Sequence, residues 1–201
     1  MVFDRTCRGP GIVPGLSTIW GAGARLYRAR GALEATFGAL SWDEALSFIA
    51  GFEPERPIGE IQFWGHGKWG SALIGDDRFD ERSLLHNDAL APALSAIRKR
   101  LHSARSLFWF RTCETLGATR GHDFAAALSE RLGCRVAGHT FVISYWQSGL
   151  HVLAPGQRPS WDPAEGLVQG TPDAPLRASH SLPNLPNTIT CWQSSIPSDF
   201  R

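Results

Sequence analysis

The chain has 201 residues, a hydrophobic fraction of 43% and a formal net charge of +1. These values fit one globular domain with a substantial core, with or without an appended tail. The small net charge argues against nucleic acid or an anionic membrane surface as the main partner. No apolar run approaches the ~20 residues of a membrane span, and no secretory signal is visible at the start.

Four widely spaced cysteines form neither a Cys-x-x-Cys pair nor a metal-ligand spacing with histidine. We therefore expect reduced thiols, a cytoplasmic location, no metal and no cofactor. Glycine motifs for phosphate or dinucleotides are missing as well. A zinc site is conceivable but has no pair at ligand spacing; its residues would be His66, Cys113, His122 and His139.

In the first half of the chain, glycine and proline residues that interrupt regular structure alternate with short apolar runs. Glycine and proline interrupt the first 30 residues, and the first strand falls either at Leu16–Trp20 or at Ala24–Tyr27. The segment Ser41-Trp-Asp-Glu44 is a capping box that starts a helix, which Gly51 ends. Two further elements are expected downstream, a short strand over Ser71–Ile74 and a helix beginning between Asp88 and Pro92.

The second half continues the alternation of strands and helices. A helix is expected from Gly121 to Leu132, where Gly133 stops it. Three short strands are expected after it, over Arg135–Gly138, Phe141–Tyr145 and Leu150–Leu153. Alternating strands and helices predict an α/β fold, a three-layer α/β/α sandwich with a mainly parallel sheet.

A proline-rich tail follows this domain. Eight of the thirteen prolines lie between Pro155 and Pro197, which excludes a regular helix. We expect a domain over residues 1–154 and a tail over residues 155–201 that packs irregularly on the domain or is partly disordered. The apolar side chains able to fix the tail are Trp161, Ile189, Trp192 and Phe200.

Two apolar segments each end at a chemically capable side chain. Glu60–Gly67 carries His66 near its end, and Ser106–Gly117 carries Cys113 directly after the apolar run Leu107–Phe110. A continuous apolar run is typical of a strand buried in a parallel sheet. Because ligands bind outside the carboxyl ends of such strands, neighbouring strands would bring imidazole and thiol together. A thiol beside a base is the smallest set of side chains that nucleophilic catalysis by cysteine requires.

Backbone groups complete this hypothetical site. The glycines that flank His66 allow close approach to a substrate, so the N–H groups of Gly67 and Cys113 are candidates to bind a developing oxyanion. Each side chain also has a plainer interpretation. His66 alone would be a loop histidine that caps a strand, and Cys113 alone would be a small core residue. Their matching positions at two strand ends favour the catalytic interpretation.

An ordered set of motifs between about residues 59 and 144 resembles the caspase-like cysteine peptidases. That group includes clostripain, gingipain, separase and the bacterial CHAT-type proteases, and the chain resembles in particular a bacterial caspase-like family of unknown function. The motifs are His66-Gly67-x-x-Gly70, Leu73-Ile-Gly75, the Cys113 strand, Gly121-His-Asp-Phe-Ala125 and Leu132-Gly133-x-x-Val136.

The resemblance implies a caspase-like sheet and a cysteine endopeptidase that acts on protein or peptide substrates. It implies Cys113 as the nucleophile, His66 as base or proton donor, the Gly67 N–H in the oxyanion hole, and an acyl-enzyme intermediate. The caspase signature Gln-Ala-Cys-x-Gly is absent, because Arg111-Thr-Cys113-Glu114 stands in its place. Aspartate specificity is therefore not carried over.

Four other side chains are candidates for a substrate pocket. Arg111 would recognise an acidic group or form a salt bridge. Asp76 and Asp77 would recognise a basic side chain or form a hydrated turn. His139 follows a strand and would line the crevice. We expect Glu114 to point away from the site, since a carboxylate facing Cys113 would raise the pKa of the thiol.

Two rival functions remain open. The first is a non-catalytic binding module that keeps the caspase-like fold and uses its aromatic residues and tail as a partner surface. The second is a cysteine acyl-transferase or amidase that uses the same pair of side chains, Cys113 and His66. An open thiol within reach of the imidazole would favour either enzyme over the binding module.

Overall fold

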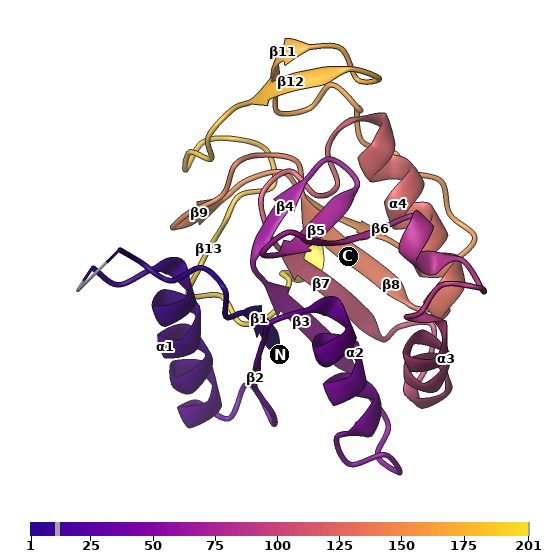
Figure 1. Ribbon diagram of the computed structural model, residues 1–201. Helices are drawn as coiled ribbons and strands as arrows, with labels where there is room; N and C mark the ends of the chain where they lie inside the picture. The colour runs from indigo at the N-terminus through magenta and orange to yellow at the C-terminus, as the bar shows by residue number, and fades with distance from the viewer. Residues whose placement is uncertain (11–12, 201) are drawn as a thin grey trace.

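The computed structural model describes residues 1–10 and 13–200. Within them, a six-stranded sheet has the order β10-β8-β7-β3-β1-β2, with five parallel strands and β10 antiparallel to β8 (Figure 1). The predicted α/β class with a mainly parallel sheet is confirmed. The strands are β1 Val2–Asp4, β2 Phe37–Ala39, β3 Glu60–Trp64, β7 Leu107–Arg111, β8 Arg135–His139 and β10 Leu150–Leu153.

In the described part of the chain, four α-helices and two short 3-10 helices accompany the sheet. They are α1 Leu16–Ala29, α2 Trp42–Gly51, η1 Arg82–Leu84, α3 Ala91–Arg100, α4 Ala118–Leu132 and η2 Ser198–Phe200. The helix cap at Ser41 is confirmed, because the Glu44 N–H donates to Ser41 Oγ at 3.2 Å. The Glu44 carboxylate accepts at 2.8 Å from the Leu40 N–H, one residue before the cap. Gly133 ends α4 in the left-handed conformation. Among the helices of residues 1–10 and 13–200, none combines the length and apolarity needed to cross a bilayer.

The predicted position of the first strand is wrong. Both candidate segments lie inside α1, and the first strand is Val2–Asp4. Two helical glycines explain the error, because they were taken as breakers. Gly21 faces the ring of Phe3, and a Cβ on Gly23 would lie 3.0 Å from the ring of Trp64. Glycine therefore lets α1 approach the sheet closely, and this packing outweighs its low helix propensity.

A small antiparallel sheet stands beyond the carboxyl end of β3. It consists of β4 His66–Lys68, β5 Ser71–Ile74 and β6 Asp77–Asp80, with β4 at one edge. Two-residue turns at positions 69–70 and 75–76 join the three strands. The predicted strand over Ser71–Ile74 is confirmed, whereas β6 was not expected.

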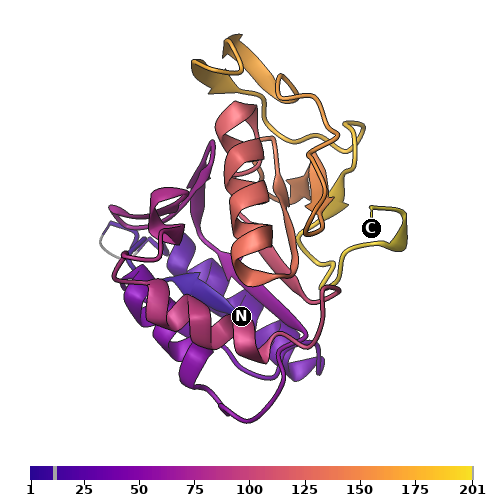
Figure 2. The same ribbon diagram turned by 90° about the vertical axis from the view of Figure 1, so that its right-hand side faces the viewer.

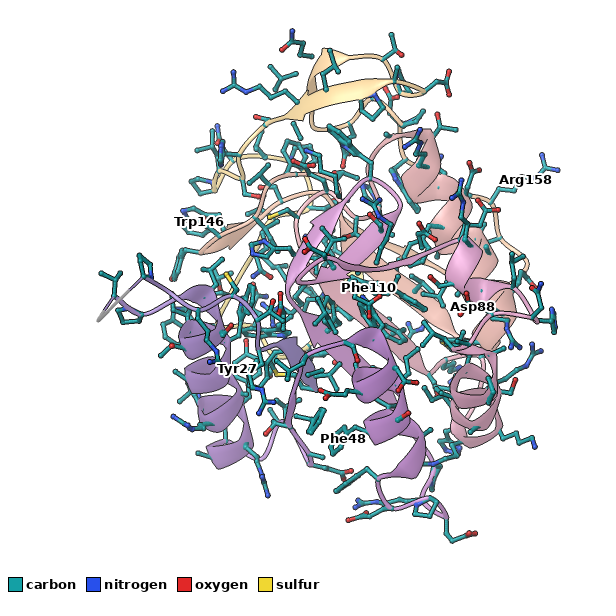
Figure 3. The ribbon with its side chains drawn as sticks, viewed as in Figure 1. Tyr27, Phe48, Asp88, Phe110, Trp146 and Arg158 are labelled. Carbon is teal, nitrogen blue, oxygen red and sulfur yellow. The ribbon has the colours of Figure 1, made fainter. Side chains whose placement is uncertain are left out.

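One side of the main sheet, here called the apolar face, carries Ile61, Phe63, Phe108 and Phe110. These side chains alternate along β3 and β7 and belong to one buried cluster with residues of α2, α3 and α4. The ring centroid of Phe110 lies 5.6 Å from that of Phe124 on α4. Figure 3 shows Phe110 at the centre of the molecule, where the sheet meets these helices.

The opposite side, here called the polar face, carries Gln62, Trp64, Trp109 and Arg111. The Arg111 guanidinium lies 4.6 Å from the ring centroid of Trp64 and 4.4 Å from that of Trp109. Helix α1 contacts this face through Tyr27, whose ring meets Trp64 edge-on at 5.5 Å. The C-terminal segment covers the rest, and Figure 2 shows it on the side of the sheet away from α2 and α3.

Residues 155–200 contain short strands and a few buried anchors. Strands β11 Leu167–Gly170 and β12 Pro175–Ala178 form a hairpin that projects from the top of the molecule (Figures 1 and 2). Strand β13 Ile189–Thr190 pairs with β9 Trp146–Gln147. The predicted strand over Phe141–Tyr145 is wrong, because that segment is a loop ahead of β9. The anchors Trp161, Ile189 and Ile196 are buried, whereas Trp192 is 53% exposed.

Candidate active site

Strands β3 and β7 are neighbours and parallel, as the site hypothesis requires. Trp64 at the end of β3 pairs with Arg111 at the end of β7. The chain continues from these positions to His66 and Cys113, so both residues follow adjacent strands at the same edge of the sheet. This edge is where open α/β sheets bind their ligands.

The β4–β5 hairpin rests directly on the loop that carries Cys113. A Cβ built on Gly67 would lie 2.1 Å from Thr115 Oγ1 and 2.6 Å from the Cys113 carbonyl oxygen. The Gly70 N–H also donates to the Thr115 carbonyl at 2.9 Å. Only glycine fits at position 67, and its contact brings the backbone next to His66 against the backbone of Cys113.

The Cys113 loop is held by backbone hydrogen bonds to the last residue of β8 and to the segment that follows it. The Glu114 N–H donates to the Phe141 carbonyl and the Leu116 N–H donates to the His139 carbonyl, each at 3.0 Å. Glu114 has a φ of +54°, the left-handed region that a residue with a Cβ seldom adopts. Strain of this kind directly after a candidate nucleophile is typical of functional sites.

The Cys113 thiol is partly buried and protonated at neutral pH. Its S–H points to the Ile143 carbonyl, with an Sγ–O distance of 3.7 Å. Burial raises the pKa of the thiol most, and the charge of Glu114 raises it further. The Ile143 contact and the charge of Lys68 act in the opposite direction. A base would therefore have to take the proton during the reaction.

The His66 ring is exposed and lies edge-on against Trp20, with ring centroids 5.5 Å apart. Among the residues that the structure describes, no hydrogen bond joins this ring to the Cys113 thiol. The two groups thus share one edge of the sheet but contact different partners, Trp20 and the Ile143 carbonyl. Hydrogen bonds of catalytic pairs often tighten only when substrate binds.

The register of the hairpin leaves the Gly67 N–H available. Lys68 pairs with Ser71 across a two-residue turn, so these two residues exchange hydrogen bonds. The next pair, Gly67 with Ala72, is then non-hydrogen-bonded, and the Gly67 N–H points away from β5. Because β4 is an edge strand, no other strand among residues 1–10 and 13–200 takes up this donor. The predicted oxyanion donor is therefore free of the ladder.

Glu114 was expected to point away from the site and instead is buried beside it. Its carboxylate is 5% exposed and lies 3.0 Å from the ammonium group of Lys68, which is 46% exposed. The ammonium group also lies 3.9 Å from the ring centroid of Trp69. The carboxylate therefore faces the site but has a cation against it, an arrangement that the sequence did not indicate.

Arg111 is not open to a substrate. It is 3% exposed, and all five of its N–H donors are engaged by the chain itself. They reach Gln147 Oε1 twice, the Tyr27 hydroxyl, and the carbonyls of Thr190 and Gln193. The guanidinium group thus joins α1, β9 and the C-terminal segment, which sequence spacing did not foresee.

The other pocket candidates also lie away from the thiol's contacts. Asp76 is exposed in the turn between β5 and β6, and Asp77 accepts a hydrogen bond at 2.7 Å from the Trp42 N–H at the start of α2. His139 is fully buried, with Nδ1 3.1 Å from the Ser148 carbonyl oxygen, and burial lowers the pKa of its ring to about 3. His139 is therefore a neutral core residue rather than part of an open crevice.

Three residues near the site were not singled out from the sequence, namely Trp20, Lys68 and Ile143. Trp20 lies in the segment whose structure was mispredicted, and Ile143 contributes only a backbone carbonyl, which no side-chain pattern reveals. Lys68 lies two residues after His66 on the edge strand β4, which puts both side chains on one side of the strand. Within the described ranges, no group of three or more histidine, cysteine or carboxylate side chains is arranged to hold a metal.

Comparison with known proteins identifies no relative of this chain, since no family model, curated protein or solved structure matches it. Its function must therefore be argued from the chemistry of the site.

Proposed function

We propose that this protein is a cysteine peptidase with a three-layer caspase-like fold, in which Cys113 is the nucleophile and His66 the base. The observation that carries the proposal is the contact of Gly67 with the Cys113 loop, because it joins the ends of β3 and β7 at one edge. The open imidazole and the partly open thiol at this edge are the two groups that acyl transfer needs. The resemblance in the motifs from His66 to Val136 supports the same assignment.

In the proposed reaction, Cys113 Sγ attacks the carbonyl carbon of a peptide bond while the thiol proton passes to His66. The Gly67 and Cys113 N–H groups donate to the oxyanion that forms. When the C–N bond breaks, His66 gives its proton to the leaving amine. Water, deprotonated by His66, then attacks the acyl-enzyme and releases the carboxylate product and the thiol. To accept the first proton, the imidazole moves from Trp20 to the thiol.

The resemblance implies protein or peptide as the substrate class, and the proposed reaction uses no metal or cofactor. Arg111 has no free donor for an acidic side chain, so aspartate preference has no support from that residue. We place the reaction in a reducing compartment such as the cytoplasm, which agrees with four cysteines that are all free thiols.

Covalent labelling tests the proposal. A peptidyl chloromethyl ketone should alkylate Cys113 in the wild-type protein, and mass spectrometry should locate the adduct. Cys113→Ala should abolish labelling, and His66→Ala should slow it at least about 100-fold, as expected for loss of a general base. Cys134→Ala is the matched control, because Cys134 is buried and burial raises the pKa of its thiol to about 12. Equal labelling of Cys113 and Cys134 would count against the proposal.

A non-catalytic binding module is the second candidate, and one observation favours it. The thiol and the imidazole contact Ile143 and Trp20 rather than each other. A module of this kind would label slowly, and His66→Ala would leave the rate unchanged. If labelling depends on His66, adding a free amine to the assay distinguishes hydrolysis from acyl transfer through the products.

A further inference from the structure

An ion pair between a buried carboxylate and a half-exposed ammonium group stands next to the candidate nucleophile. The Glu114 carboxylate, 5% exposed, lies 3.0 Å from the Lys68 ammonium group. The two residues flank the site from its two sides, since Lys68 ends the strand that begins with His66 and Glu114 directly follows Cys113. Burying a carboxylate beside a thiol that must lose a proton opposes catalysis unless a cation compensates the charge.

We propose that Lys68 is a positioning residue of this site, whose ammonium group neutralises Glu114 and thereby keeps the Cys113 thiol able to lose its proton. The inference rests on the proposed function in one respect, the role of Cys113 as nucleophile. Lys68 acts through Glu114 and does not touch the reacting atoms.

The groups that face Cys113 support this assignment. The Glu114 charge raises the pKa of the thiol and the Lys68 charge lowers it, while the remaining polar contact is the neutral Ile143 carbonyl. His66, on the same strand as Lys68, is the proton acceptor itself. The left-handed backbone of Glu114, with φ at +54°, fixes the carboxylate beside the loop. The structure thus couples a strained residue to a cation, Lys68, that offsets the effect of its charge on the thiol.

The test measures the alkylation rate of Cys113 by iodoacetamide as a function of pH, with the modified peptide followed by mass spectrometry. Lys68→Met should move the midpoint of the rate profile to higher pH by about one unit, and Glu114→Gln should move it to lower pH. Because thiolates of higher pKa are also more nucleophilic, the rate at pH 7.5 should change by only about threefold in each case. Lys68→Arg should keep the wild-type profile.

Matched controls separate electrostatics from structural damage. The chain has two lysines, and Lys99→Met on the exposed face of α3 removes the same charge away from the site. Glu55→Gln is the corresponding control for Glu114→Gln, because it removes the charge of an exposed carboxylate. Both should leave the profile unchanged. The double variant Lys68→Met, Glu114→Gln should return the midpoint to within about half a unit of the wild type, which a merely disrupted loop would not do.

Two results would overturn the inference. One is a shift of the midpoint in the same direction in both single variants, and the other is no shift in either. The measurement needs no peptide substrate. A protein without peptidase activity that still shows opposite shifts would refute the proposed function and leave the electrostatic role of Lys68 in place.

Discussion

The two faces of the central sheet are stabilised in different ways. On the apolar face, Phe63, Phe108 and Phe110 pack against three helices, and any well-fitting apolar side chain meets the same requirement. On the polar face, Arg111 makes five directional hydrogen bonds to partners between 36 and 84 residues away in sequence. The stability of the apolar face therefore depends on how well its volume is filled, and that of the polar face depends on hydrogen-bond geometry. Cys113 follows β7, which contributes side chains to both faces, so the position of its loop depends on filled volume and on hydrogen-bond geometry.

The largest expected effect comes from breaking the polar face. Arg111→Gln removes both donors of the buried Gln147 Oε1 and one donor each from the Tyr27 hydroxyl and the carbonyls of Thr190 and Gln193, so we expect a loss of about 4 kcal/mol in the free energy of unfolding. Urea denaturation measures it. Phe110→Leu, one position away on the apolar face, should lose only about 1.5 kcal/mol.

Arg25→Gln on the exposed side of α1 is the control for removal of a charge and should change the free energy of unfolding by less than about 0.5 kcal/mol. If Arg111→Gln were no more harmful than Phe110→Leu, the distinction between the two faces would be wrong.

The apolar face is the part of the fold that the sequence predicted well. Helix α2 was located from its capping box, α4 from its periodicity and Gly133, and β7 from the continuous apolar run. These signals are local, because each lies within the element that it marks. Helix α1 was missed because Gly21 and Gly23 allow contacts with Phe3 and with Trp64, and Trp64 is 41 residues away from Gly23.

The second prediction concerns the tail residue that reaches the apolar side. The Trp161 indole N–H donates to the Leu116 carbonyl at 3.0 Å, in a buried contact. Trp161→Phe keeps most of the packing but leaves that carbonyl unpaired, so we expect a loss of about 2 kcal/mol. Thermal unfolding measures it. Because Leu116 lies three residues after Cys113, alkylation of that thiol should also change in rate.

Trp192→Phe tests the specificity of that effect. Trp192 is also an indole of the tail, but it is half-exposed, and its replacement should leave both stability and alkylation unchanged within error. Equal effects of the two substitutions would mean that the indole hydrogen bond to Leu116 is not what stabilises the loop.

The candidate site was predicted in part. The sequence placed His66 and Cys113 after two strands, and those strands are indeed adjacent and parallel. Arg111, Asp76 and Asp77 were chosen by charge and His139 by its place after a strand, and neither criterion reveals burial. Arg111 and His139 are enclosed by the segment from Trp146 to Gln193, whose proline-rich sequence has no periodicity from which its path could be deduced.

The third prediction uses pH to weaken the polar face. His139 is neutral in the folded protein because burial lowers its pKa from 6.5 to about 3. Below pH 6.5 the unfolded chain therefore binds a proton that the folded chain does not, and stability falls as pH falls toward 3. Between pH 6.5 and pH 5 this residue should account for a loss of about 1.5 kcal/mol.

His139→Asn should remove that part of the pH dependence, whatever its effect on stability at pH 7. Unfolding by urea at several pH values measures the slope, and His86→Asn at an exposed position should leave it as in the wild type. An unchanged slope in His139→Asn would show that His139 is not the buried neutral group on this face.

The smallest expected effect lies on the apolar side, where stability comes from many small local contributions. Ser41 caps α2 by accepting the Glu44 N–H, and the same helix start receives a second acceptor from Asp77 through the Trp42 N–H. Ser41→Ala should therefore cost about 1 kcal/mol, as for an ordinary helix cap, and Ser41→Gly only a few tenths. Asp77→Asn keeps an oxygen acceptor and should have an intermediate effect. Since the hydrogen bonds at the start of α2 involve Glu44, Asp77 and Ala72 rather than the Cys113 loop, alkylation of Cys113 should stay at the wild-type rate in all three variants. A change in that rate would mean that the apolar face also controls the geometry of the site, and that the contrast between the two faces holds for stability alone.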